Sequence, residues 1–90
     1  MKPFKVGTKR YIYDDKAPNN EGVCLAHILA VIPHPDYPKT SSIIVYRFWS
    51  RYKHAYVYGA KPLGNLAVWD CYVKKVLSNR KQKKMKEIKE

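Results

Sequence analysis

The longest stretch of mostly apolar residues in this sequence is short, and it sets the scale of the fold. It covers the ten residues 23–32 (VCLAHILAVI), between Gly22 and Pro33. A membrane-spanning helix needs about 20 apolar residues in a row, so we expect neither a membrane span nor a membrane partner. This length suits a buried strand or a short helix, and the flanking glycine and proline and the β-branched residues near its end favour a strand.

Segments rich in turn-forming residues lie on both sides of this stretch. Residues 14–22 (DDKAPNNEG) and 33–42 (PHPDYPKTSS) contain the Asp, Asn, Gly and Pro that surface loops use for local caps and for fixed or positive φ angles. They predict two loops. Residues 4–13, which precede the first loop, predict a further strand with a bend at Gly7.

The region after the second loop has the composition of a β-hairpin. Residues 43–49 (IIVYRFW) are β-branched and aromatic, residues 50–53 are suited to a turn, and residues 54–58 (HAYVY) return the chain. Residues 59–65 (GAKPLGN) interrupt the pattern. We therefore expect a hairpin between about residue 43 and residue 58.

The pattern of residues 66–77 fits two structures. As a helix, it places Leu66, Trp69, Val73 and Val76 on one face. As a strand, it alternates from Asp70 onward, and its Val, Trp, Tyr and Cys content favours a turn followed by a strand near residues 70–76. Residues 78–90 are rich in lysine and predict a frayed helix or a disordered tail.

These elements predict a mainly β fold: a small, strongly bent sheet or an SH3-like barrel of about five strands, with a basic C-terminal helix or tail. The order of a short strand with a glycine bend, a long loop, an apolar strand and a tight hairpin is similar to that of SH3-like barrels. The alternative is an α+β fold with a helix at residues 66–77. We expect one domain over residues 1–77 and a basic extension over residues 78–90.

The chain is strongly basic, with 18 Lys and Arg against 7 Asp and Glu, a net charge of +11. Residues 1–76 carry 12 of these cations and five of the acids, so +7 of the charge precedes the lysine-rich tail. A basic domain of this kind attracts polyanions, and nucleic acid is the first expectation.

The hairpin interleaves aromatic rings with cations. In a strand, Ile44, Tyr46 and Phe48 share one face, and Arg47 and Trp49 share the other. If the first face is core, the second presents an indole for base stacking beside cations for phosphates. The residues expected to bind nucleic acid, largely without sequence preference, are Arg47, Trp49, Arg51, Tyr52, Lys53, Lys74, Lys75, Arg80, Lys81, Lys83 and Lys84.

Other interpretations fit the same residues. The aromatic side chains can cover a small core with arginine stems packed over them, and the tail can serve solubility. An SH3-like protein-interaction module would grip a peptide or an acidic partner protein with exposed aromatic residues. A small accessory protein that intercepts a nucleic-acid-binding machine is a third possibility, for which the sequence has no signature.

The sequence predicts no metal, no cofactor and no enzymatic activity. Cys24 and His27 have the spacing of half a zinc site, but a second pair at matching spacing is missing. Asp70 and Cys71 have no histidine nearby in sequence, and neither a Gly-rich phosphate-binding motif nor a nucleophile elbow is present. No secretory signal precedes the cysteines, so we expect reduced thiols and a cytoplasmic location, with a Cys24–Cys71 disulfide in a secreted protein as the alternative.

Overall fold

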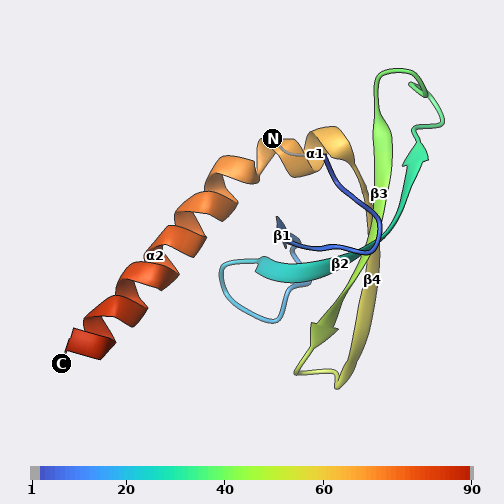
Figure 1. Ribbon diagram of the computed structural model, residues 1–90. Helices are drawn as coiled ribbons and strands as arrows, with labels where there is room; N and C mark the ends of the chain where they lie inside the picture. The colour runs from blue at the N-terminus through green and yellow to red at the C-terminus, as the bar shows by residue number, and fades with distance from the viewer. Residues whose placement is uncertain (1–2, 90) are drawn as a thin grey trace.

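The chain folds into one antiparallel sheet followed by two helices (Figure 1). The computed structural model describes residues 3–89, and the side chains of residues 3–83. Its elements are β1 (Lys9–Tyr13), β2 (Val23–Pro33), β3 (Ser42–Ser50), β4 (Ala55–Pro62), α1 (Leu63–Val68) and α2 (Asp70–Lys89). The strands lie in the order β1-β2-β3-β4. The prediction of a mainly β fold is confirmed.

The hairpin is the part of the sheet that the sequence predicts best. β3 and β4 pair from Ser50 opposite Ala55 to Ile43 opposite Pro62, with a four-residue turn at residues 51–54. The strand predicted over residues 4–13 is shorter than expected. It begins only at Lys9, because Gly7 has a φ of +86° and Thr8 turns back to the carbonyl of Lys5.

The prediction of a strand near residues 70–76 is wrong. These residues lie in α2, and the helical alternative for residues 66–77 holds in the form of two helices that meet at Trp69. Burial decides the outcome, because Val73 and Val76 are at helical spacing and both pack against Val23. The described chain therefore has four strands rather than about five, in a sheet that is not closed into a barrel.

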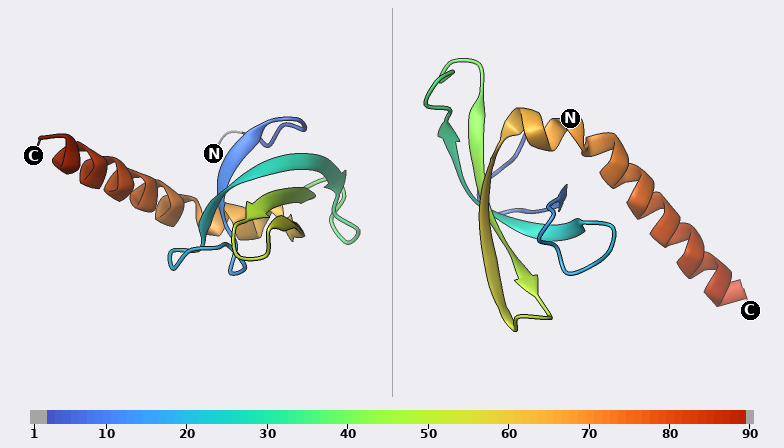
Figure 2. Two further views of the ribbon diagram at one scale, coloured as in Figure 1. Left: turned by 90° about the horizontal axis from the view of Figure 1, so that it is seen from below. Right: turned by 180° about the vertical axis from the view of Figure 1, so that it is seen from behind.

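The sheet bends strongly along β2. Figures 1 and 2 show β1 and the start of β2 turned away from the direction of β3 and β4. The pairing of β2 with β3 shifts register between Ile28 and Ala30, and a bulge of this kind increases local twist. The bend brings the loop at residues 14–22 back toward the hairpin.

Two clusters of buried side chains hold the elements together. The larger lies on the inner face of the sheet, where Leu66 of α1 covers it. Its buried members are Ile12, Cys24, Ala26, Ile28, Ile44, Tyr46, Phe48 and Leu66. The smaller cluster joins Val23, on the opposite face of β2, to Val73 and Val76 of α2.

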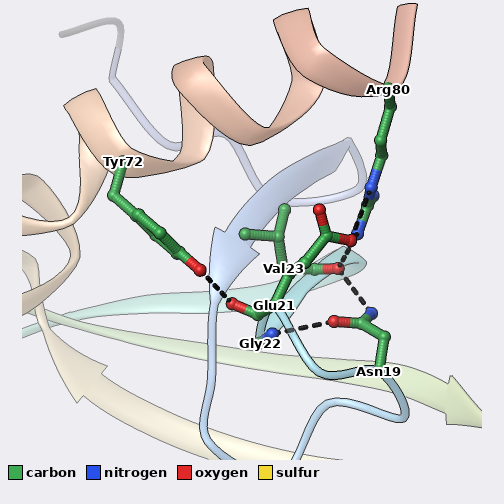
Figure 3. Close-up of polar contacts among 6 residues, drawn as sticks. All are labelled: Asn19, Glu21, Gly22, Val23, Tyr72 and Arg80. Carbon is green, nitrogen blue, oxygen red and sulfur yellow. Dashed lines mark hydrogen bonds and ion pairs between the residues drawn. The ribbon is translucent and has the colours of Figure 1, made fainter. Parts of the chain in front are cut away.

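The first turns of α2 lie against the sheet, and its C-terminal part projects away from it (Figure 2). Polar contacts complete the attachment, because the Tyr72 hydroxyl donates to the Glu21 carbonyl at 2.8 Å and Arg80 forms an ion pair with the Glu21 side chain (Figure 3). α2 continues through residues 77 and 78, the position at which composition separates a β domain from a basic extension. That boundary stays a prediction.

Candidate nucleic-acid interface

The two faces of β3 differ as the alternation of its residues predicts. Tyr46 and Phe48 are fully buried, whereas Trp49 on the other face is 53% exposed. Arg47 lies on the same outer face, one pleat from Trp49. Directly opposite these two residues on β4 are Tyr58 and Tyr56. The outer face of the hairpin is therefore an aromatic surface with a cation set in it.

Tyr56 holds the two β3 side chains in place. Its ring meets the Trp49 indole edge-on, with centroids 5.2 Å apart and planes at 80°. The Arg47 guanidinium lies 4.2 Å from the centroid of the same ring. The Arg47 Nε is buried and has no hydrogen-bond partner among the described residues, so the ring is the main neighbour that orients this guanidinium.

Trp49 lines a pocket together with residues from two other parts of the chain. The pocket has a volume of about 380 Å³ and is lined by Pro18, Asn19, Trp49, Arg51 and Arg80. We call these five residues the Trp49 pocket. Three of them, Trp49, Arg51 and Arg80, are predicted binding residues that the fold brings together from the hairpin and from α2.

The wall of the Trp49 pocket formed by the loop and α2 is fixed by hydrogen bonds (Figure 3). Arg80 donates from Nε and Nη2 to Glu21 Oε1 at 3.1 and 2.7 Å, and from Nη2 to the Val23 carbonyl at 3.1 Å. Asn19 donates to the same carbonyl at 2.8 Å and accepts from the Gly22 amide at 2.7 Å. Arg80 is thus held in a defined position, and Glu21 offsets part of its charge.

Arg51, Tyr52 and Lys53 lie together in the turn that ends the hairpin. Tyr52 is 70% exposed, and the Arg51 guanidinium lies 5.3 Å from the centroid of its ring. The Lys53 amide donates to the Ser50 hydroxyl at 3.3 Å, and His54 closes the turn with a φ of 51°. These side chains extend the cationic and aromatic surface beyond the Trp49 pocket.

The lysines of α2 are spread around the helix. Lys74 forms an ion pair with Asp70 at 3.2 Å and lines a separate groove of about 370 Å³ with Lys9 and Arg10. The structure therefore does not join Lys74 to the Trp49 pocket. The side chains of Lys75, Lys81 and Lys83 are exposed, and that of Lys84 lies outside the described residues.

Sequence reasoning missed the contribution of Pro18, Asn19 and Glu21. Their loop was expected only to expose turn-forming residues, and nothing in its composition indicates that it lines a pocket. The approach of this loop to Trp49 results from the bend in β2 and from the Arg80 contacts, both of which join residues distant in sequence.

The buried titratable groups lie on the other face of the sheet. Burial, together with the charge of Asp14, raises the pKa of Cys24 to about 12, so this thiol is protonated at neutral pH. Burial and a hydrogen bond to Asp14 also raise the pKa of Tyr46. Cys71 is exposed on α2, and residues 3–83 contain no group of three or more His, Cys, Asp and Glu side chains arranged to hold a metal ion.

Two further observations bear on the class of protein. None of the helices within residues 3–89 is long and apolar enough to cross a membrane. Comparison with protein-family models, with curated proteins and with solved structures finds no match to this chain.

Proposed function

We propose that this protein binds nucleic acid through the Trp49 pocket and the adjoining hairpin turn. The observation that carries the proposal is the convergence of an exposed indole with two arginines from distant parts of the chain in one pocket. Indole rings stack on nucleic-acid bases, and guanidinium groups bind phosphate through charge-assisted hydrogen bonds. The combination fits a nucleotide better than either residue type alone.

Binding of this kind is largely independent of sequence. Stacking tolerates every base, because each base has a π face, and phosphate contacts carry no sequence information. Lys53 in the turn and the exposed Lys81 and Lys83 of α2 supply further positive charge near the pocket's two arginines. No part of this chemistry requires a cofactor or a metal ion. The free thiols of Cys24 and Cys71 fit a reducing location such as the cytoplasm.

The aromatic face of the hairpin supports a second candidate, an SH3-like module that binds a peptide or an acidic protein. Trp49, Tyr56 and Tyr58 are all exposed, and aromatic grooves bind Pro-rich peptides in modules of that class. A Pro-rich peptide does not need Arg51 and Arg80, whereas a phosphate does. The two arginines therefore favour nucleic acid over a Pro-rich peptide, and the exposed Trp49 indole, which can stack on a base, favours it over an acidic protein.

The salt dependence of binding tests the proposal. We expect fluorescently labelled DNA and RNA oligonucleotides to bind at low salt, with an affinity that falls steeply as salt rises. Arg51→Ala removes one phosphate contact and should reduce the slope of log K against log salt by about 0.7 for a single strand. Lys39→Ala is the matched control, because Lys39 is exposed in the loop at the far end of β3 (Figure 1).

Two outcomes would contradict the proposal. One is the absence of DNA or RNA binding by the folded protein at low salt. The other is salt-insensitive binding of a Pro-rich peptide that depends on Trp49 and Tyr56 but not on Arg51, which would support the protein-interaction module.

A further inference from the structure

We infer that the Trp49 pocket selects single-stranded over double-stranded nucleic acid by accepting one unpaired base together with a phosphate of its strand. This inference rests on the proposed function and adds the class of ligand. It follows from the size of the pocket, the way the indole is held and the donors that remain on Arg80.

The pocket has room for one nucleotide. Its volume of about 380 Å³ is at the lower end of the range for small-molecule sites, about 300–1,000 Å³. Its walls come from three different elements, the 14–22 loop, the hairpin and α2, and it is open to solvent on its outer side. A base pair inside a duplex cannot enter a space of this size with its neighbours still stacked on it.

The position of Trp49 favours an unpaired base. Tyr56 contacts the indole edge-on at 5.2 Å, and the indole remains 53% exposed. A duplex hides the faces of its bases inside the stack and offers only their edges in the grooves. A base that stacks on Trp49 must therefore come from a single strand or leave the duplex, which costs unstacking energy.

The arginines are placed to hold a phosphate next to that base. The described contacts of Arg80 use Nε and Nη2, both directed to Glu21 and Val23. A guanidinium has five N–H donors, so those of Nη1 remain for a ligand. Arg51 adds a second guanidinium from the end of the hairpin. Pro18 supplies an apolar wall that a base or sugar can contact.

The fluorescence of Trp49 tests the inference directly. The sequence contains two tryptophans, and Trp69→Phe leaves Trp49 as the single reporter while it keeps an aromatic ring stacked on Tyr13. We expect oligo(dT) and oligo(U) to quench this variant strongly at low salt. A fully paired duplex of the same length should bind more weakly and quench little. Trp49→Phe, which leaves Trp69 as the reporter, should show little quenching with any of these ligands.

Affinity measurements with substituted proteins complete the test. Trp49→Ala should weaken single-strand binding by about 5- to 150-fold and change duplex binding little, as expected for the loss of one stacked base. Tyr37→Ala is the matched control, because Tyr37 is 63% exposed in the loop at the far end of the sheet. Circular dichroism checks that each variant is folded, and the quenching experiment needs no change at Trp49.

The outcomes separate the two proposals. Equal affinity for single strands and duplexes would overturn the selectivity and leave nucleic-acid binding at the pocket in place. Single-strand binding that leaves Trp49 fluorescence unchanged would overturn binding at the Trp49 pocket. The absence of binding to all three ligands would overturn both.

Discussion

The hydroxyl of Tyr46 on β3 donates a hydrogen bond to the carboxylate of Asp14, which follows directly after β1. Both side chains are buried, and the same carboxylate accepts from the Lys16 amide at 2.8 Å. The contact joins the 14–22 loop to the strand that carries Trp49. It therefore connects two walls of the Trp49 pocket through the interior of the protein.

Loss of this hydrogen bond should lower the free energy of unfolding. Tyr46→Phe leaves the buried Asp14 carboxylate without its side-chain partner, at a cost of about 1–3 kcal/mol. Urea denaturation measures the change. Tyr58→Phe is the control, since the Tyr58 ring is 60% exposed and loss of its hydroxyl should have little effect. Equal stability of the two variants would contradict the role given to the Tyr46–Asp14 contact.

A methyl group at Gly59 should be poorly tolerated. A Cβ atom there would lie 2.9 Å from the ring and hydroxyl of Tyr46, which is buried and hydrogen-bonded and so cannot move easily. Gly59→Ala should destabilise the protein by about 1–3 kcal/mol. Gly64→Ala should instead be neutral or stabilising by up to about 1 kcal/mol, because Gly64 lies in α1 with open space around it. Thermal unfolding measures both effects. A Gly59→Ala variant that is as stable as Gly64→Ala would contradict the close packing of Gly59 against Tyr46.

Glu21 should limit the affinity for nucleic acid. Glu21→Gln removes the negative charge beside Arg80 and should strengthen oligonucleotide binding about two- to fivefold at low salt, the range of a partly exposed ion pair. The same change should cost at most about 1 kcal/mol of stability. Asp36→Asn, at the far end of the sheet, changes the net charge equally and serves as the control. Weaker binding by Glu21→Gln would show that the ion pair is needed to form the site.

The two thiols should differ in reactivity. Cys71 is exposed, and burial raises the pKa of Cys24 to about 12, so a thiol reagent at mildly alkaline pH should modify one cysteine in the folded protein and both in urea. Rapid modification of Cys24 in the folded Cys71→Ala variant would contradict the burial that the structure gives it.

The same shift predicts how stability depends on pH. The unfolded Cys24 thiol loses its proton near pH 9.0, whereas the folded thiol keeps it to about pH 12. Between these values the folded state binds more protons, so the free energy of unfolding falls as pH rises. The raised pKa of Tyr46 acts in the same direction. Cys24→Ala should reduce the slope of stability against alkaline pH, and an unchanged slope in urea denaturation would contradict the assignment.

Local pattern was enough to predict the hairpin and the two faces of β3. Tyr46 and Phe48 alternate with Arg47 and Trp49, and only one arrangement buries the first pair and leaves the cation near solvent. The same reasoning failed for residues 70–76, whose strand-forming side chains pack as a helix. Contacts of Val73 and Val76 with Val23, about 50 residues away, outweigh that propensity.

The Trp49 pocket was predicted only in part, for the same reason. Trp49 and Arg51 were expected together because they are neighbours in sequence. The sequence indicates Arg80 as a binding residue because it lies in a basic run, and not because of its position in the fold. Arg80 lies beside Trp49 and Arg51 because it contacts Glu21 and Val23 and because β2 bends.

An NMR titration of the isotope-labelled protein with oligo(dT) at low salt tests the central claim most directly, because it reports on every part of the surface at once. The indole N–H of Trp49, the amides of residues 47–53 and 18–22, and the side chain of Arg80 should shift, while the loop at residues 34–41 should not. Shifts confined to that loop or to the groove beside Lys74, or none at all, would contradict binding at the Trp49 pocket.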